Sequence, residues 1–272
     1  MTAVLYCQGT FSTANPTNEQ KIAMEAAAQA IGSAGFGCVI LGQWHVHADG
    51  GIFYNDTALS DVGATLEWLP AALRKAGVQQ VLVSFGPFAS DFAHIIDPTN
   101  LGPFKTAMES LLKSCAIDGI DWDLEESLTP ANATALAGLL DWAMSHSFIS
   151  TADPYYAQPE YWNAVQKQAK YGFAWWNVQM YASQTNEDMY AEWVEGVTGL
   201  VDDPQAFIRP GYNVAASNGD PASITQMLAA DRANAPGIDG AMLWKYEFIV
   251  TGTKGTLQDY AQAIQAGVDP SA

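Results

Sequence analysis

The 272-residue sequence predicts a single closed (β/α)₈ barrel, an α/β fold that occupies residues 1–272 as one domain. Short apolar runs alternate with amphipathic helical stretches along the whole length, which is typical of βα units and a parallel sheet. Eight such units fit a chain of this length, because barrels of this class take about 250 residues. The sequence shows no linker and no repeat beyond the βα unit.

The expected strands are short and apolar, and an expected helix separates most of them. We predict strands over residues 3–9, 36–42, 79–86, 117–125, 148–152, 174–181, 206–209 and 240–244. We predict helices over residues 19–31, 62–76, 100–114, 130–145, 159–170, 187–200 and 223–234. Thr129 followed by Pro130 is a start signal, a capping side chain before proline at the first helical position. The longest insertion, residues 43–60, follows the second strand.

A doubly wound open sheet shows the same alternation of strands and helices, so it is the competing architecture. That fold commonly carries a G-x-G-x-x-G turn directly after a strand, where it binds dinucleotides. The sequence has no such turn. The closed barrel is therefore the preferred prediction.

The charge balance excludes some classes of partner. The chain carries 29 acidic and 11 basic residues, a formal net charge of −18. A surface of this sign repels the phosphate backbone of nucleic acids and anionic membranes, so we expect neither as a partner. The sequence contains no run of about 18 apolar residues, so it predicts no membrane span. A neutral polysaccharide is not repelled by this charge.

The cysteines and the N-terminus bear on the compartment. Cys7, Cys38 and Cys115 lie in apolar strand or helix patterns, and we expect buried free thiols, with a disulfide between two of them as the alternative. The sequence enters a strand-like run at once, without a charged n-region or a cleavage site. We expect a secreted protein whose signal peptide is not part of this sequence, with a cytoplasmic location as the alternative.

The fourth expected strand carries a stripe of acids. Side chains alternate faces along a strand, so Asp121, Asp123 and Glu125 share one face, and Ile120 and Trp122 lie on the other. The apolar face of a barrel strand packs on helices, so we expect the acids to line the interior. Glu125 falls at the carboxyl end of the strand, where barrel active sites lie.

Three ionised carboxylates inside a barrel repel one another and lose hydration. We therefore expect at least one of them to stay protonated near neutral pH, which is what a general acid requires. The alternative interpretation is a metal-binding or solvated strand end. A second metal hypothesis rests on His45-Val46-His47 after the second strand, since an H-x-H pair binds zinc in some barrel hydrolases. His94 and His146, the other two histidines, do not closely follow an expected strand.

Residues 118–125 match the D-G-x-D-x-D-x-E signature of glycoside hydrolase family 18, the chitinases and related endo-β-N-acetylglucosaminidases. Four acids and one glycine within eight residues make a specific match. The local sequence resembles hevamine-type and short microbial chitinases. Segments 84–86, 177–181 and 240–244, on the third, sixth and eighth strands, resemble further family segments in the required order.

The resemblance implies a retaining hydrolase that cleaves β-1,4-linked N-acetylglucosamine polymers, chitin or chitooligosaccharides, with catalytic assistance from the substrate's acetamido group. It implies that Glu125 is the general acid, that Asp123 orients the acetamido N–H, and that Asp121 shares a proton with Asp123. Tyr181 would donate a hydrogen bond to the acetamido carbonyl. The resemblance requires no metal and no organic cofactor, and we expect a monomer.

The remaining site predictions concern substrate binding. The resemblance implies that Trp244 floors the sugar subsite. Gln179, two residues before Tyr181, shares its face and resembles the glutamine of hevamine-type enzymes. Further candidate substrate-binding residues are Ser84, Phe85 and Gly86 on the third strand and Tyr6 on the first. Two segments depart from the family pattern: Pro87 replaces a second glycine, and Thr151-Ala152-Asp153-Pro154 follows it only loosely. Aromatic residues that we expect near the same end of the barrel, to bind sugar or to pack in the core, are Trp44, Tyr54, Tyr155, Tyr156, Trp175, Trp176 and Tyr212.

Two other functions remain open. A chitinase-like lectin keeps the barrel but typically lacks the glutamate or an aspartate of the signature, whereas this sequence has the full set. An endo-β-N-acetylglucosaminidase acting on N-glycans would use the same chemistry, with its substrate choice in the loops.

Overall fold

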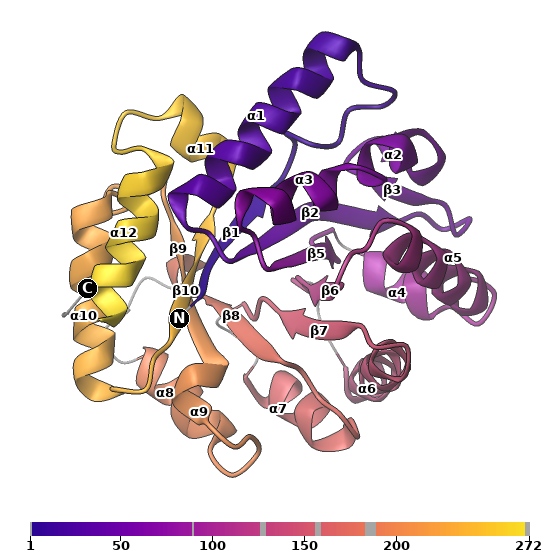
Figure 1. Cartoon of the computed structure of the whole chain (residues 1–272). Coiled ribbons are helices and arrows are strands. Elements are labelled where there is room, and N and C mark those ends of the chain that lie inside the picture. Colours follow the sequence, from indigo (N-terminus) through magenta and orange to yellow (C-terminus); the bar gives the residue numbers. More distant parts are fainter. Residues whose placement is uncertain (1, 89, 126–128, 156–158, 183–188, 270–272) are drawn as a thin grey trace.

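The computed structural model describes residues 2–88, 90–125, 129–155, 159–182 and 189–269, and Figure 1 shows helices arranged around a ring of strands. The strands are β1 (Thr2–Cys7), β2 (Cys38–Val46), β3 (Ile52–Tyr54), β4 (Thr57–Ala58), β5 (Gln80–Phe85), β6 (Gly119–Trp122), β7 (Ile149–Ala152), β8 (Trp175–Gln179), β9 (Ile208–Asn213) and β10 (Gly240–Trp244). Each of the eight predicted strands overlaps one of these strands, although the bounds differ by several residues in places.

The sheet closes on itself. Parallel pairing runs through β1, β2, β5, β6, β7, β8, β9 and β10, and β1 pairs in parallel with both β2 and β10. The prediction of a single (β/α)₈ barrel is confirmed, and the open-sheet alternative is excluded. The short strands β3 and β4 add antiparallel to the end of β2 and do not belong to the ring.

The helices surround the barrel (Figure 1). They are α1 (Asn18–Ala34), α2 (Leu59–Leu66), α3 (Leu69–Ala76), α4 (Asp91–Ile96), α5 (Leu101–Ser114), α6 (Pro130–Ser145), α7 (Pro159–Gln168), α8 (Met189–Val197), α9 (Pro204–Phe207), α10 (Pro221–Asn234), α11 (Tyr246–Thr251) and α12 (Leu257–Val268), with a short 3₁₀ helix at Met180–Ala182. Helix α6 begins as predicted, because the Thr129 side chain caps it in a capping box with Asn132.

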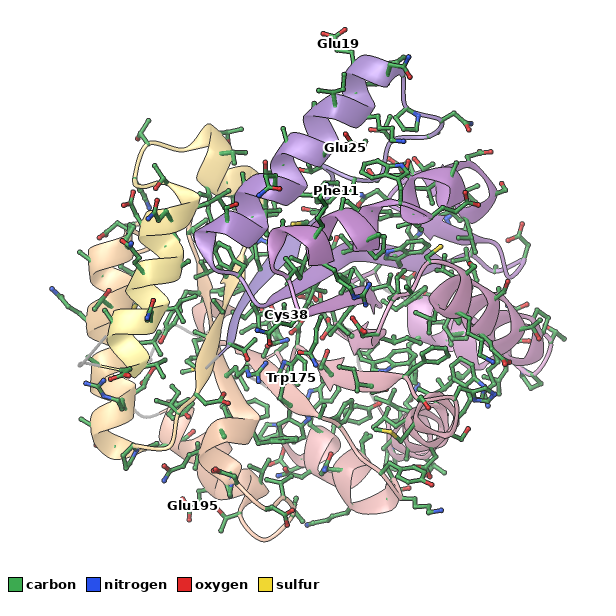
Figure 2. All side chains as sticks on the ribbon, in the orientation of Figure 1. Phe11, Glu19, Glu25, Cys38, Trp175 and Glu195 are labelled. Carbon is green, nitrogen blue, oxygen red and sulfur yellow. The ribbon has the colours of Figure 1, made fainter. Side chains whose placement is uncertain are left out.

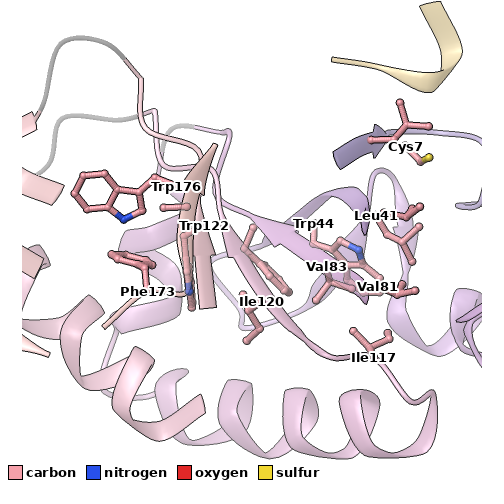
Figure 3. Packing of buried hydrophobic residues seen from close by; sticks show 14 of the residues in the cluster. Cys7, Leu41, Trp44, Val81, Val83, Ile117, Ile120, Trp122, Phe173 and Trp176 are labelled. Atoms are coloured by element: carbon pink, nitrogen blue, oxygen red, sulfur yellow. The ribbon is translucent and has the colours of Figure 1, made fainter. Parts of the chain in front are cut away.

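The larger hydrophobic core lies between the strands and the helices. Ile120 and Trp122 of β6 are fully buried there, beside Val81 and Val83 of β5 (Figure 3). A second, smaller cluster fills the inside of the barrel, and it includes Cys38 and Trp175, at the centre of Figure 2. The alternation predicted for the fourth strand is thus confirmed, with apolar residues toward the helices and acids toward the interior.

The structure corrects three predicted elements. The predicted helix 62–76 is two helices, because the chain breaks at Glu67 and Trp68 before α3 begins with proline in its first turn. The predicted strand 206–209 is wrong in its first half: Asp203 caps α9, and β9 begins only at Ile208. The insertion at 43–60 holds the end of β2 and the β3–β4 hairpin, which turns at Asn55 with a φ of 48°.

The cysteine prediction is confirmed, since Cys7, Cys38 and Cys115 are buried free thiols. Within the described residues, the helices are all too short or too polar to cross a membrane.

Candidate active site

Two of the three predicted acids on the fourth strand are buried at the centre of the barrel. Asp121 lies on β6 and is fully buried, and Asp123 follows the strand and is 3% exposed. The chain continues past β6 in an extended course, held by a hydrogen bond from the Asp123 backbone N–H to the carbonyl of Phe85. Glu125 comes two residues later and is exposed. The stripe therefore rises from the interior to the surface, as a site reached from solvent requires.

Gln179 joins the upper two acids, although it comes from β8. Its side-chain Nε2 donates to Asp123 Oδ1 at 2.9 Å and to Glu125 Oε1 at 3.1 Å. The same nitrogen lies 3.1 Å from the carbonyl of Asp153. The predicted placement of Gln179 in the site agrees with this geometry, and its amide group fixes the relative position of the two carboxyls.

Asp121 is surrounded by hydroxyl groups from three other strands. Tyr6 of β1 donates to Asp121 Oδ2 at 2.5 Å, and Ser84 of β5 donates to the same oxygen at 2.8 Å. Thr151 of β7 donates to the other oxygen, Oδ1. Tyr6 and Ser84, which we expected to bind substrate, are both buried beneath the cleft, so they contact Asp121 and support it from below.

Asp153 is the site residue that the sequence did not identify. It follows β7, is 1% exposed, and accepts a hydrogen bond from Tyr6. Its backbone N–H is bonded to the carbonyl of Trp122, which continues the β6–β7 pairing. The available signal was one aspartate at the end of a predicted strand, in a segment that departs from the family pattern.

Burial and mutual repulsion raise the pKa of the interior acids. Burial is the largest cause for Asp123, followed by the negative charges of Glu125 and Asp121, while hydrogen bonds from Gln179 and Gln43 act in the opposite direction. Burial also raises the pKa of Asp153 well above its usual range, followed by the charge of Asp121. The sequence-based expectation that at least one carboxyl of this strand stays protonated agrees with the direction for Asp123.

A cavity of about 390 Å³ opens above these acids. Its lining consists of Gln43, Asp123, Glu125, Tyr155, Gln179, Tyr181 and Trp244. These residues come from the ends of β2, β6, β7, β8 and β10, so the cavity lies at the carboxyl-end face of the barrel. Five predicted site residues thus meet in one cavity.

A second cavity, of about 750 Å³, shares Tyr181 with the first. Its polar lining includes the side-chain amides of Asn213, Asn218 and Gln226, and Asp231 is its one carboxyl among the described lining residues. Lys and Arg are absent from that described lining. The two cavities therefore adjoin at Tyr181, and side-chain amides make up much of the polar lining of the second.

Of the predicted substrate-binding residues on the third strand of the barrel, β5, Ser84 supports Asp121 and Phe85 lies outside the site. The Phe85 ring is fully buried on the helix side of β5, at 5.3 Å between ring centroids from Phe104 and 6.4 Å from Trp122. The prediction that Phe85 binds substrate is corrected accordingly, because side chains alternate and Ser84 takes the interior face. Gly86 has a φ of 109°, and a Cβ there would come within 2.2 Å of the Leu124 side chain.

The aromatic residues divide between cavity and core. Tyr155 lines the first cavity and Tyr212 the second. Trp44, Tyr54 and Trp176 are fully buried in the outer core, and Trp175 lies inside the barrel, where Arg209 packs over its ring at 4.1 Å. Tyr156 lies outside the described residues.

The histidines contact aromatic rings and backbone carbonyls. His45 and His47 lie against Phe53 in an aromatic cluster, with ring centroids 5.6 and 4.0 Å from it. The ring of His94 bonds the carbonyl of Val46. Among the residues that the structure describes, no group of three or more His, Cys, Asp or Glu side chains is placed to hold a metal ion. The H-x-H zinc hypothesis finds no support here.

Among known proteins, this chain resembles solved structures. No protein-family model and no curated protein matches the sequence. A fungal endo-β-N-acetylglucosaminidase of glycoside hydrolase family 18 matches with a TM-score of 0.73 at 18% identity, over 100% of this chain and 99% of its own. A chitinase from Aspergillus fumigatus matches with a TM-score of 0.70 at 19% identity, over 94% of each chain.

The same fold also occurs in a protein named for binding. A chitinase-like agglutinin from Robinia pseudoacacia matches with a TM-score of 0.64 at 13% identity, over 96% of this chain and 98% of its own. These likenesses show that the chain has the barrel fold found in family 18 proteins.

Proposed function

We propose that this protein is a retaining glycoside hydrolase of the family 18 type, which cleaves β-1,4-linked N-acetylglucosamine polymers with Glu125 as its general acid. The observation that carries the proposal is the single cavity in which Asp123, Glu125 and Tyr181 meet above a buried acid network. The resemblance of residues 118–125 to the family signature and the fold of the similar structures support it.

Glu125 suits the role of acid because of its position. It is exposed in the cavity, and the Gln179 amide holds its Oε1 at 3.1 Å. A carboxyl that faces the cleft can donate its proton to the glycosidic oxygen of a bound sugar chain and take a proton from water in the second half of the reaction. Its partner Asp123 lies deeper and does not need to meet the leaving group.

Asp123 and Tyr181 assist the first half of the proposed reaction, in which the substrate's acetamido group is the nucleophile. The acetamido carbonyl oxygen of the bound sugar attacks the anomeric carbon as the glycosidic bond breaks, which gives a cyclic oxazolinium ion. Asp123 accepts the acetamido N–H and stabilises the positive charge. The hydroxyl of Tyr181, whose pKa is raised by burial and by the charge of Asp123, stays protonated and donates to the acetamido oxygen.

The aromatic floor of the cavity suits a sugar. Trp244 lines it and packs on Tyr6 with 5.1 Å between ring centroids, so its indole is held from below. A rigid aromatic face matches the apolar face of a pyranose ring. The lining beyond Tyr181 is rich in amide groups and, among its described residues, holds no Lys or Arg, which agrees with a neutral polymer that continues past the reacting sugar.

An endo-β-N-acetylglucosaminidase acting on N-glycans is the second candidate. The fungal endo-β-N-acetylglucosaminidase has the higher TM-score of the two enzymes compared above, and the larger cavity beside Tyr181 offers room for a branched glycan. A lectin function is the third, and the complete acid set argues against it.

Hydrolysis of N-acetylglucosamine tetramer to hexamer, followed by mass spectrometry, tests the proposal. We expect the wild type to cut these oligomers and Glu125→Gln to lose at least about 100-fold in rate while remaining folded. Glu192→Gln, at an exposed glutamate on α8, is the matched control and should keep the wild-type rate. Binding without cleavage by the wild type would favour the lectin, and cleavage of N-glycans alone would favour the second candidate.

A further inference from the structure

The Tyr6 hydroxyl carries one proton but lies within hydrogen-bond distance of two carboxyl groups, those of Asp121 and Asp153. The Tyr6 oxygen contacts Asp121 Oδ2 and Asp153 Oδ2, and Ser84 Oγ lies 2.7 Å from it. A hydroxyl group donates one proton, so it serves one carboxylate at a time. If both acids were ionised, one of these close oxygen contacts would have no proton between two buried, negatively polarised atoms. The geometry therefore requires a further proton in this cluster.

The two carboxyls are not equivalent as places for that proton. Asp121 receives hydroxyl donors on both of its oxygens, from Ser84 and Tyr6 on one and from Thr151 on the other. Donors of this kind favour the ionised form of a carboxyl. Asp153 shares the Tyr6 hydroxyl and is also linked to Asp121 by a side-chain hydrogen bond, while among the described residues its buried Oδ1 has no hydrogen-bond donor.

We propose that Asp153 is protonated in the resting protein and that its proton, shared with Asp121 and Tyr6, positions Asp121 beneath Asp123. Asp121 then carries the negative charge of the pair, and Asp153 acts as a carboxylic acid that can donate a hydrogen bond. Asp153 is a positioning residue, because it acts on Asp121 through the Tyr6 hydroxyl and is not among the described residues that line the cavity. The expected effect of Asp153 on turnover depends on the proposed hydrolase function, whereas the proposed protonation of Asp153 does not.

The described groups that act on the charge of Asp153 are acids and weak acids from several strands, with no Lys, Arg or His among those that are described. They are Tyr6 of β1, Asp121 of β6, Asp123 after β6, Cys38 of β2 and Tyr181 after β8. Burial raises the pKa of Asp153, and the neighbouring negative charges raise it further, which agrees with the proton count.

The first test reads the proton on the wild type alone. In protein labelled with ¹³C at the aspartate carboxyls, the Asp153 resonance can be assigned through its own backbone and followed against pH by NMR. We expect the shift of a carboxylic acid at neutral pH. The shift of a carboxylate, with a titration near the ordinary value of 3.8, would overturn the proposal. Because no variant is needed, a folding failure cannot obscure the result.

The second test uses folding linkage. A carboxyl whose pKa is raised in the folded state binds a proton there more tightly than in the unfolded chain, so it lowers stability as pH rises from 3.8 through the raised value. Asp153→Asn keeps the shape and a donor but removes this proton. Between about pH 5 and 8, the proton on Asp153 should make the unfolding equilibrium constant of the wild type rise by up to about tenfold per pH unit. The Asp153→Asn variant should lack this contribution, so its unfolding constant should depend less steeply on pH. Equal slopes would overturn the proposal.

Ser150→Ala, on β7 three residues before Asp153, provides the matched control. Ser150 is 2% exposed, and its hydroxyl has no hydrogen-bond partner among the described residues. Its variant should keep the wild-type pH slope. If the wild type hydrolyses no sugar polymer, the proposed function fails, while both measurements on Asp153 still decide its protonation. If it does hydrolyse them, Asp153→Ala should lower kcat by about tenfold or more, with partial rescue in Asp153→Asn, which can still donate to Asp121.

Discussion

The hydroxyl of Tyr6 lies 2.5 Å from Oδ2 of Asp121, and the two residues are 115 positions apart in the chain. Tyr6 is the last residue but one of β1, and Asp121 lies in the middle of β6, across the interior of the barrel. Closure of the sheet brings them together. Because this contact is buried, it couples the stability of the barrel to the state of the acids below the cavity.

Tyr6→Phe removes this hydroxyl and keeps the ring. We expect a loss of about 1–3 kcal/mol in the free energy of unfolding, because buried carboxyl oxygens lose a donor. Urea unfolding measures it. Tyr54→Phe is the matched control, since Tyr54 is equally buried but donates a single 3.3 Å bond to the carbonyl of Cys7. A loss no larger than that of the control would contradict the role assigned to the Tyr6 hydroxyl.

Gln179→Glu replaces the shared amide donor with a carboxyl. At neutral pH the new group is repelled by Asp123 and Glu125, and we expect kcat/KM to fall by at least about tenfold. The same repulsion raises the pKa of the new carboxyl, so its protonated form can donate as pH falls, and activity should partly recover on the acid side. Steady-state kinetics across pH test this. Gln29→Glu, at an exposed glutamine on α1, is the control. If the pH profile of Gln179→Glu runs parallel to that of the control, the Gln179 amide does not have the proposed role.

Trp244 and Phe85 are both large aromatics on barrel strands, with opposite expected effects. Trp244→Ala should raise KM for oligosaccharides by about tenfold, since the ring lines the cavity. Phe85→Leu should leave KM unchanged and cost about 1–2 kcal/mol of stability, because its ring is fully buried against Phe104. Kinetics and unfolding of both variants separate the two roles. A raised KM in Phe85→Leu would restore that residue to the site.

Gly86 has a specific backbone requirement. Gly86→Ala should destabilise the protein by about 1–3 kcal/mol, because its φ is 109° and the new Cβ would meet the Leu124 side chain. Gly138→Ala in the middle of α6, where the added Cβ meets nothing within 4 Å, should instead be neutral or stabilise by up to about 1 kcal/mol. Thermal unfolding of the two variants measures the difference. A similar decrease in the unfolding temperature of both variants would contradict the specific requirement for glycine at position 86.

The acid strand was predictable because its information is local. A period of two along residues 118–125 places Asp121 and Asp123 on one face, and the structure confirms it. The same rule, applied to Ser84 and Phe85, would have placed the phenyl ring outside the site. Our prediction followed the motif instead of the alternation there.

Asp153 was not predictable in this way. Its contact with Tyr6 depends on the register between β6 and β7, where Asp121 pairs with Thr151, and on closure of the sheet through β1. Register and closure are properties of the whole barrel, and no short segment encodes them. The turn at Asn55 was also missed. The strand before it, β3, pairs with the end of β2, where Tyr54 stacks on Trp44 with 4.8 Å between ring centroids in the core, so its surroundings too depend on tertiary contacts.

The central claim is that the acetamido group of the substrate, aided by Asp123 and Tyr181, attacks the anomeric carbon with Glu125 as acid. The configuration of the first product formed from N-acetylglucosamine tetramer, read by proton NMR before mutarotation, tests it most directly. Attack by the acetamido oxygen and then by water inverts the centre twice, so the account predicts that the new reducing end appears first as the β-anomer. An initial α-anomer would mean direct attack by water and would contradict the account.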